Sequence, residues 1–381
     1  MSLFLFTFFL VYGGVHVYTF VKARQAIGFG PLPGTLLAIF LVGMVIAPLL
    51  VRAIERQGHE TAARLMAYTG YSWMGFLFLF FSAAVAIDCY RLVLFLVAHV
   101  WHLDLGRLAV SPRAALCLPL AWGVATSLYG YFEARDIRTD RVVVRSSKVP
   151  REAGKLVIVQ MSDVHLGLIV REERLAKMLA CVRAASPDLL VVTGDLVDGQ
   201  INGLTGLAEQ FRQISPRFGK YAVTGNHEFY AGIGQALAFE ERAGFTLLRG
   251  KAVPVTKYLT LAGIDDPTVS RSKRGSASPE AQLLQSLPRD RFTILLKHRP
   301  AVEKSSLGRF DLQLSGHVHK GQLFPFNLVT YLFYPVKAGL SGVGEGSSLY
   351  VSRGTGTWGP PLRFLASPEV TVIELLPTSG E

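Results

Sequence analysis

Residues 157–167 read Val157-Ile158-Val159-Gln160-Met161-Ser162-Asp163-Val164-His165-Leu166-Gly167, and this stretch decides the fold. Three β-branched residues followed by polar residues and glycine predict a buried strand that ends just before Asp163. Open α/β sheets bind ligands at the carboxyl ends of their strands, so Asp163 and His165 are expected at a binding edge. Residues two apart on an extended segment point the same way. A carboxylate and an imidazole aimed at one point suit a divalent metal ion.

Hydrophobic residues are concentrated in the first third of the chain. The protein has 381 residues, a mean hydropathy of +0.35 and a net charge of +11. Residues 1–130 hold 8 Lys+Arg and 4 Asp+Glu, whereas residues 131–381 hold 31 and 24. The first third therefore has the composition of a membrane domain, and the remainder that of a soluble domain. The three cysteines form no motif, so we expect neither a disulfide framework nor a thiolate metal site.

Four apolar stretches of about 20 residues are long enough to span a membrane as helices. They cover residues 3–21, 32–51, 73–87 (or on to 97) and 114–131. We therefore predict a transmembrane domain over 1–131, a linker over 132–154 and a second domain over 155–377. Four spans put the N-terminus and the second domain on one side of the cell membrane. The total of flanking arginines favours the cytoplasmic side, whereas Lys22 and Arg24 after the first span favour the other.

Asp88 and Arg91 lie three residues apart, inside or beside the third apolar stretch. Such a pair can mark a functional site within the membrane. More often it lies at a helix end, where it is neutralised or reaches the interface. We expect the second situation here.

Strand and helix patterns alternate through the second domain. Strands are predicted at 156–160, 189–193, 220–224, 245–248, 258–263, 292–296, 312–315, 348–351 and 370–375, and helices at 171–185, 204–215, 233–243 and 279–287. Alternation of this kind followed by several strands predicts a layered α/β domain.

Five of the predicted strands end in residues that commonly bind metals. The motifs are Asp163-x-His165, Gly194-Asp195-x-x-Asp198, Gly225-Asn226-His227-Glu228, His298-Arg299 and Gly316-His317-x-His319. All five histidines of the second domain lie in these motifs. Histidines with only a structural role would seldom all lie at strand ends beside Asp or Asn. Glycine before three of the motifs permits a tight turn out of the strand. The pattern predicts a metal centre.

In these motifs the sequence resembles the calcineurin-like metallophosphoesterases, whose motif string is D-x-H, G-D-x-x-D, G-N-H-[DE], an isolated H and G-H-x-H. The resemblance covers residues 155–376, and details such as Gly316 to Gln322 are similar to the membrane-associated YkuE/YaeI-type branch. The four spans resemble those of transmembrane proteins with a metallophosphoesterase domain. The resemblance implies an α/β fold, a four-layer αββα sandwich preceded by an α-helical transmembrane domain of four spans. Lys320 departs from the branch, which usually has glycine there.

The resemblance also implies two divalent metal ions (Mn, Fe or Zn) and a metal-bridging hydroxide that attacks phosphorus. Asp195 would bridge both ions. The other ligands would be Asp163, His165 and His319 for the first ion, and Asn226, His298 and His317 for the second. His227 resembles the residue that protonates or stabilises the leaving oxygen.

Further residues near the motifs are candidates for supporting roles. Glu228 and Asp198 would orient the histidines, although an ordinary loop role is nearly as plausible. The candidates for binding a substrate phosphate are Arg299, Lys320 and Arg363, each of which is equally compatible with a solvated surface. A basic loop at 269–276 is expected to influence specificity. The aromatic segment 323–340 is either core or a membrane-facing lip beside the site.

The sequence therefore predicts a membrane-anchored hydrolase that cleaves a phosphodiester or pyrophosphate bond. Its location favours a lipid-linked phosphoester substrate, with membrane lipids as further partners. A nucleotide or nucleic-acid phosphodiesterase is the alternative among enzymes, and a membrane sensor whose domain only binds is the alternative outside them. Nucleic acid is not expected, because the chain lacks a run of aromatic residues interleaved with Lys and Arg. The sequence leaves the oligomeric state open.

Overall fold

The computed structural model describes residues 2–199, 203–269 and 278–378, so most of the expected basic loop lies outside the described residues. The chain divides into two compact units. The helical unit comprises Met1–Phe132 with the short segment Gly359–Phe364, and the sheet unit comprises Glu133–Trp358 with Leu365–Glu381. The domain boundaries predicted from the sequence stay a prediction.

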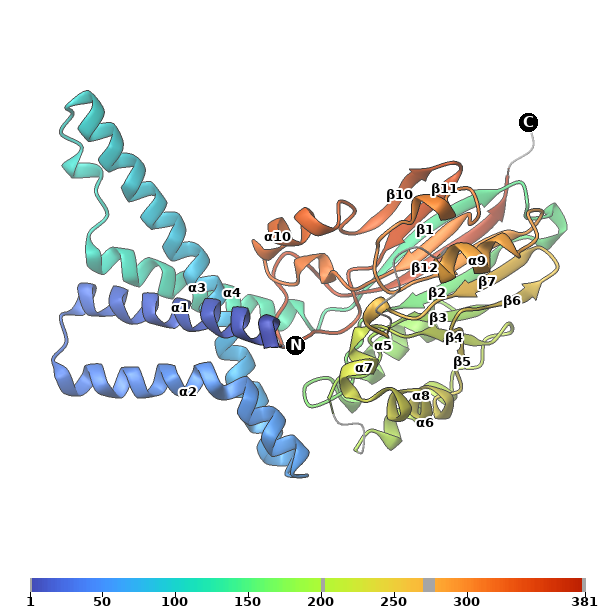
Figure 1. Ribbon diagram of the computed structural model, residues 1–381, viewed down its shortest axis with the longest axis horizontal. Helices are drawn as coiled ribbons and strands as arrows, with labels where there is room; N and C mark the ends of the chain where they lie inside the picture. Colours follow the sequence, from blue (N-terminus) through green and yellow to red (C-terminus); the bar gives the residue numbers. More distant parts are fainter. Residues whose placement is uncertain (1, 200–202, 270–277, 379–381) are drawn as a thin grey trace. The chain divides into compact units, whose positions relative to one another are not determined.

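The described part of the helical unit contains four helices that are long and apolar enough to cross a membrane. They are α1 (Ser2–Ile27), α2 (Pro31–Arg56), α3 (Glu60–Trp101) and α4 (Pro112–Glu133) (Figure 1). Tyr12, Leu77, Phe80 and Leu116 form part of a buried core, while large apolar side chains such as Leu32 face outward, as lipid-facing residues do. The four predicted spans are thus present as helices.

Helix α3 is much longer than the stretch predicted from hydropathy. It has 42 residues, which at about 1.5 Å per residue gives roughly 63 Å, twice the hydrocarbon thickness of about 30 Å. Its first turns, from Glu60 to Arg64, are polar, and hydropathy therefore missed them although they form helix readily.

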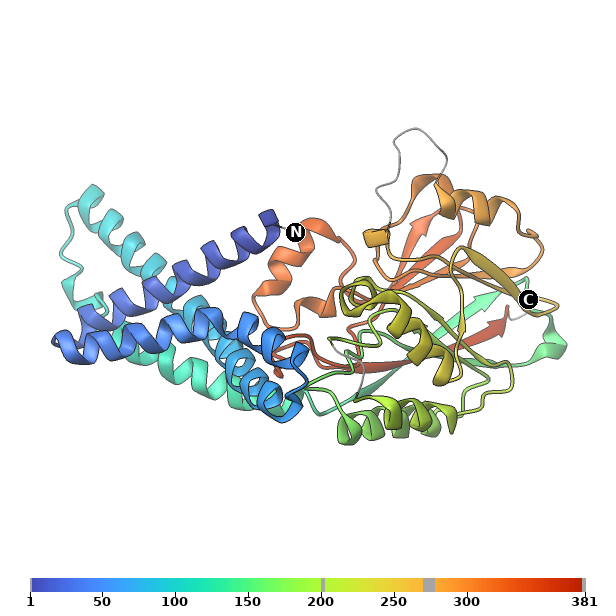
Figure 2. The same ribbon diagram turned by 60° about the horizontal axis from the view of Figure 1, so that its bottom comes forward.

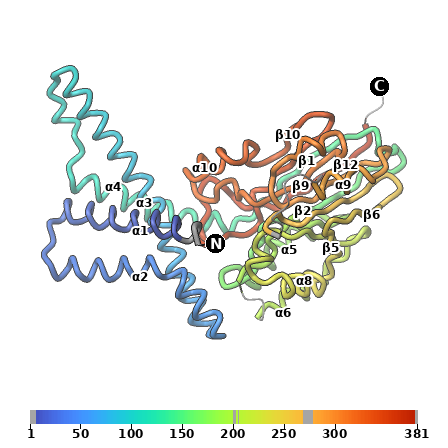
Figure 3. Tube along the Cα trace, in the orientation of Figure 1, coloured from blue at the N-terminus to red at the C-terminus, as the bar shows by residue number. Residues whose placement is uncertain are grey.

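The sheet unit is built on two six-stranded sheets. In the first sheet the strand order is β1 (Arg138–Ser146), β12 (Glu369–Pro377), β2 (Leu156–Met161), β3 (Leu189–Thr193), β4 (Lys220–Val223) and β5 (Thr246–Leu247). In the second it is β10 (Gly339–Gly344), β11 (Ser347–Val351), β9 (Leu312–Ser315), β8 (Phe292–Leu296), β7 (Leu259–Gly263) and β6 (Lys251–Thr256). Strands β1 and β12 come from opposite ends of the unit's sequence and lie side by side (Figure 3). The predicted linker therefore contains a strand.

Helices cover the outer faces of both sheets and a shared core lies between them. The helices of this unit are α5 (Glu172–Ala184), α6 (Thr205–Arg212), α7 (Asn226–Ala231), α8 (Ile233–Arg242), α9 (Pro279–Gln285) and α10 (Phe326–Phe333). Helix α10 does not belong to a covering layer, since it contacts the turn His319–Gly321 and buries none of its residues. Ile158 and Val191 of the first sheet pack in one buried cluster with Leu261 and Ile294 of the second. On the outer face of the second sheet, Leu284 of α9 packs against Leu295, and Figure 2 shows the remaining helical layer on the opposite side. The expected αββα sandwich is confirmed.

Strand direction brings the predicted motifs to one edge of the sandwich. Strands β2, β3 and β4 are parallel neighbours in the first sheet, and β8 and β9 are parallel neighbours in the second. Parallel strands end at the same edge of their sheet. The two edges meet, because the amide of His317 after β9 donates to Asp163 after β2 at 3.0 Å, so the loops that follow these five strands share one face of the unit.

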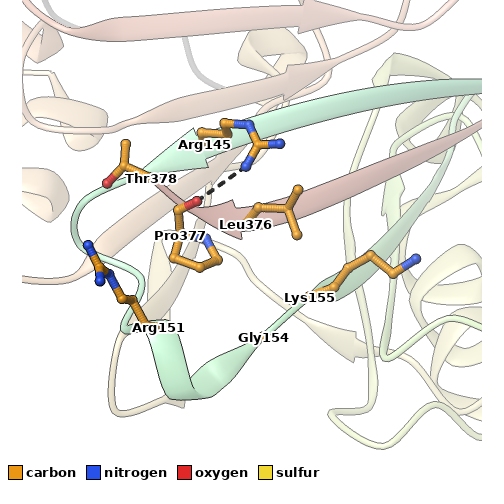
Figure 4. A pocket seen from close by; sticks show the side chains of 7 residues that line it. All are labelled: Arg145, Arg151, Gly154, Lys155, Leu376, Pro377 and Thr378. Carbon is orange, nitrogen blue, oxygen red and sulfur yellow. Dashed lines mark hydrogen bonds between the residues drawn. The ribbon is translucent and has the colours of Figure 1, made fainter. Parts of the chain in front are cut away.

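A cavity of about 480 Å³ lies at the other end of the first sheet (Figure 4). It is lined by Arg145 at the end of β1, by Pro377 at the end of β12 and by Lys155 just before β2. Because the metal-binding motifs follow the opposite end of β2, this cavity is not part of the candidate site.

Candidate metal centre

The loops after β2, β3, β4, β8 and β9 bring the predicted ligands together. Ligand atoms of His and Asp side chains form three overlapping groups, in each of which the atoms lie within 4.8 Å of one another. The groups are Asp163, His165 and His319; His165, Asp195 and His227; and Asp195, His298 and His317. Six of the seven predicted ligands and the predicted acid His227 therefore gather in one cluster, although they come from five different loops.

Two pairs of imidazole nitrogens face each other at short distance. His165 Nε2 lies 3.1 Å from His319 Nε2, and His298 Nε2 lies 3.1 Å from His317 Nδ1. Two imidazoles that bind one metal ion at about 2.0–2.1 Å place their nitrogens roughly 3 Å apart. In His298 the other ring nitrogen, Nδ1, lies 2.8 Å from the carbonyl oxygen of Thr193, which suits an Nδ1–H donor and leaves Nε2 for a metal ion.

Two buried carboxylates lie among these imidazoles. Asp163 Oδ1 is 3.3 Å from His319 Nε2, and Asp195 Oδ2 is 3.2 Å from His298 Nε2. Burial alone would raise the pKa of both carboxyls, but the neighbouring histidines outweigh it and hold both below the usual range. Burial likewise disfavours the imidazolium of His298, yet Asp195 raises its pKa to about 10. A divalent ion in this place would displace the proton and take over the compensation of charge.

Two buried polar atoms of the predicted ligands have no hydrogen-bond partner among the described residues. They are Asn226 Oδ1 and His165 Nδ1. Leaving buried polar atoms unpaired costs about 1–3 kcal/mol each, so folded proteins seldom do so without a ligand or water in reach. Carboxylate oxygens, imidazole nitrogens and one amide oxygen form a mixed N/O donor set that suits Mn, Fe or Zn. The residues present therefore fit the metals expected from the sequence.

The backbone of this cluster is strained at the predicted ligands. Asp163, His165, Asp195, His317 and His319 all have φ between 47° and 72°, in the left-handed region. For residues other than glycine this conformation costs about 1–2 kcal/mol each. Strain of this kind gathers at functional sites, where the surrounding structure holds it in place.

The glycines of the motifs serve two different purposes. Only Gly194 needs the left-handed backbone, with φ of 89°, and there the expected tight turn is found. A Cβ atom on Gly225 would lie 2.2 Å from Asp195 Oδ1, and one on Gly316 would lie 2.1 Å from Asp163 Oδ2. At these two positions the reason for glycine is thus close approach to a predicted ligand rather than turn geometry.

His227 belongs to the cluster and contacts the carboxylate of Asp198, which is not a predicted ligand. Its Nδ1 is 2.9 Å from Asp198 Oδ1, and its backbone amide donates to Asp195 Oδ1 at 2.8 Å. Burial lowers the pKa of His227, but Asp195 and Asp198 outweigh it and raise this pKa to about 9. An imidazolium oriented in this way can give a proton to a leaving oxygen.

The Glu228 carboxylate binds backbone amides, whereas the sequence led us to expect that it would orient the histidines. Its carboxylate accepts hydrogen bonds from the amides of Asp195 at 3.0 Å, Leu196 at 2.7 Å, Val197 at 3.3 Å and Gly225 at 2.6 Å. It thereby ties the loop after β3 to the loop after β4. Asp198, by contrast, contacts His227 as expected.

The three residues proposed to bind phosphate lie in different surroundings. Arg299 is partly exposed and held by buried Asp266, with Nε donating to Oδ2 at 2.7 Å and Nη2 to Oδ1 at 3.0 Å. Lys320, next to the predicted ligand His319, is partly exposed with φ of 50°. Arg363 belongs to the helical unit, where its side chain is fully buried and its amide donates to the carbonyl of Gly130.

Sequence reasoning missed several residues around the cluster. Asp266 orients Arg299, and it follows β7, whose end carries no motif. The ring of Trp358, also missed, lies 5.7 Å from that of His227. Tyr334 was part of the aromatic segment 323–340 singled out from the sequence, and its ring lies 5.7 Å from that of His317. The amide of Gly356 donates to the carbonyl of Asp163 at 2.9 Å. The local sequence Gly354-Thr355-Gly356 is a signal that could have pointed to this last segment.

Comparison with known proteins places this site in a family. A family model described as calcineurin-like phosphoesterase matches residues 156–321, which contain all seven predicted ligands. An uncharacterized metallophosphoesterase of Aquifex aeolicus is 35% identical over 253 residues, which are 66% of this chain and 97% of that protein. The uncharacterized metallophosphoesterase YkuE of Bacillus subtilis is 32% identical over 263 residues, 65% of this chain and 89% of that protein.

One relative extends the similarity into the helical unit. A transmembrane protein with metallophosphoesterase domain from Bos taurus is 30% identical over 356 residues, which are 87% of this chain and 80% of that protein. The fold and the site thus define a metal-dependent phosphoesterase domain joined to membrane-spanning helices. The chain belongs to the calcineurin-like phosphoesterase family, and it is a hydrolase of phosphoester bonds located in a membrane.

Proposed function

We propose that this protein hydrolyses a phosphodiester or pyrophosphate bond of a lipid-linked substrate with the help of two divalent metal ions. The observation that carries the proposal is the membership of Asp195 in two of the three ligand groups. A carboxylate shared in this way is suited to bridge two ions. The ligands proposed from the sequence are Asp163, His165, Asp195 and His319 for one ion, and Asp195, Asn226, His298 and His317 for the other.

The chemistry divides between the metals and the protein. When bound, two divalent ions neutralise the phosphoryl oxygens and supply a hydroxide nucleophile at neutral pH. The protein holds the ligands on a strained backbone that Glu228 ties together, so that their geometry is set before substrate arrives. His227, oriented by Asp198, donates a proton to the leaving oxygen. Arg299, fixed by Asp266, offers its remaining N–H groups to a substrate phosphate.

An exposed apolar surface beside the centre supports a lipid-linked substrate. Helix α10 and its flanks form what we call the apolar lip, made of Phe324, Phe326, Leu328, Val329, Tyr331, Leu332 and Phe333. Each of these side chains is at least 41% exposed, and Leu332 reaches 79%. Tyr334 directly after the helix contacts His317, so the lip adjoins the predicted ligands. Lys337 lies over the Tyr331 ring at 4.2 Å, a combination common at membrane interfaces.

The test is hydrolysis by the purified full-length protein in detergent with Mn, Fe or Zn. The substrates should be a lipid pyrophosphate, its water-soluble analogue with the same head group, a nucleotide phosphodiester and a phosphomonoester. We expect the lipid pyrophosphate to be cleaved fastest. Equal rates on the lipid and its soluble analogue would remove the support for a lipid-linked substrate. A nucleotide preference would favour the other enzymatic alternative, and inertness toward every class would favour a domain that only binds.

We also propose that the sheet unit faces the cytoplasm from the cell membrane. The total of flanking arginines supports this orientation. Of two reporters fused after Arg151, one that functions only inside the cell and one that functions only outside it, the first should then be active and the second inactive. Activity restricted to a reporter that works outside would reverse the assignment.

A further inference from the structure

A cavity of about 410 Å³ opens between α1, α3 and α4 within the helical unit. Polar residues from two helices line it: Tyr18, Lys22 and Gln25 from α1, with Asp88 and Arg91 from α3. Ala115 of α4 lines it as well. Because α1 ends at Ile27 and α4 begins at Pro112, the cavity lies where two of the four apolar helices end.

Three of these polar groups satisfy one another. Lys22 Nζ donates to Asp88 Oδ1 at 2.7 Å and to the Tyr18 hydroxyl at 3.0 Å. The Tyr18 hydroxyl donates to Asp88 Oδ2 at 2.6 Å. The Lys22 side chain is only 8% exposed, whereas that of Asp88 is 38% exposed, so the ammonium group is largely removed from water and the carboxylate is only partly so. One positive and one negative charge are thereby compensated.

Arg91 leaves one positive charge in excess. It is 43% exposed, and its nearest carboxylate oxygen among the described residues is the same Asp88 Oδ1, at 3.9 Å. That oxygen already accepts from Lys22 at much shorter distance. The cavity therefore holds two cations and one anion. In a membrane an excess charge of this kind is costly unless an ion of opposite sign compensates it.

We propose that this cavity binds the phosphate of an anionic membrane phospholipid. A phosphodiester headgroup carries the single negative charge that is needed, and Arg91 and Gln25 offer N–H groups to its oxygens. Val21 and Ala115 give the cavity an apolar wall for the adjoining glycerol and acyl carbons. Basic pockets between membrane helices bind lipid headgroups in this manner. The site shares no residue with the metal centre.

The test measures retention of phosphatidylglycerol by the full-length protein in phosphatidylcholine nanodiscs that contain a minor fraction of it, with native mass spectrometry as the readout. Arg91→Gln should weaken retention about fivefold, since one arginine near a lipid phosphate contributes on that order. Ala115→Phe fills the cavity without changing charge and should weaken it as well. Arg24→Gln is the matched control, because Arg24 is an exposed arginine of α1 outside the cavity lining.

Retention by Arg91→Gln equal to that of the wild type would overturn the proposal. An equal loss in Arg24→Gln would do the same, because it would mean general attraction to the membrane surface. A further measurement adds inorganic phosphate to the protein in discs of phosphatidylcholine alone. If phosphate raised the melting temperature there, and Arg91→Gln abolished that rise, the cavity would bind phosphate from solution instead of a lipid headgroup. Neither readout involves hydrolysis, so failure of the proposed phosphoesterase reaction leaves this test intact.

Discussion

The two units each contain a cluster of charged groups, buried in the sheet unit and partly exposed in the helical unit, and the two clusters differ in their uncompensated charge. In the helical unit, Lys22, Tyr18 and Asp88 satisfy one another and a neighbouring arginine leaves an excess of positive charge. In the sheet unit, imidazole nitrogens face each other at 3.1 Å beside two carboxylates, which is an excess of lone pairs and negative charge. The sign of the excess indicates the sign of the ligand: an anion for the first cluster and cations for the second.

The largest effect is expected at the shared carboxylate. Asp195→Asn should reduce bound metal and lower kcat by at least about 10³-fold, because several kcal/mol of charge stabilisation are lost at both proposed ions. Metal analysis and steady-state kinetics on one preparation would measure both. Asp290→Asn, on an exposed loop, is the control and should change neither. Full activity of Asp195→Asn would show that this cluster is not the catalytic centre.

The next effect separates proton transfer from metal binding. His227→Gln should lower kcat by about 10²–10⁴-fold while metal content stays near that of the wild type. The loss should shrink on a substrate whose leaving group is already acidic, because such a group needs no proton. A loss that is equal for acidic and basic leaving groups would point to a structural role for His227.

In the helical unit the corresponding change is Lys22→Met. This variant leaves Asp88 without its closest cationic partner and should destabilise the protein by about 1–3 kcal/mol. This range lies below that for a fully buried ion pair because Asp88 is 38% exposed. The double variant Lys22→Met with Asp88→Asn should recover part of the loss. Thermal unfolding in detergent measures both. If the double variant were no better than Lys22→Met, the loss would come from packing rather than from an unpaired carboxylate.

The smallest effect concerns a buried carboxyl outside both clusters. Glu240 is fully buried, neither carboxyl oxygen has a partner among the described residues, and burial raises its pKa well above 4.5. Since its folded pKa is raised, its contribution to stability is fully present below about pH 4.5 and is lost as the pH rises toward that folded pKa. Glu240→Gln should therefore raise the melting temperature at pH 7, by about 2–4 °C per kcal/mol gained.

This gain should shrink as the pH falls toward 4.5, and a series of melting curves across that range would show it. Glu241→Gln on the exposed side of the same helix is the control. A gain that did not change with pH would mean that ionisation of Glu240 is not its cause.

Local patterns allowed much of the fold to be predicted. The strands before the five motifs were predicted within a residue or two, as for β2 at 156–161, because runs of apolar residues that end in glycine and polar residues are local signals. Strands β6 and β10 and helix α7 were missed. Helix α7 begins at Asn226, inside a motif that we expected to form a loop, and its start was therefore not recognised. Helix α10 was not predicted either, because its eight residues are fewer than the window of about 11–18 residues in which a helical period can be recognised.

The sequence by itself determined the residue types of the metal centre, their order along the strands and the presence of four apolar spans. Each of these features depends only on residues that are neighbours in the sequence. Only the tertiary structure decided that Glu228 ties two loops together and that Lys22 is the partner of Asp88 across 66 positions. These partners are chosen by packing between distant segments, and the periodicity of a single segment carries no information about the side chain that will lie opposite it.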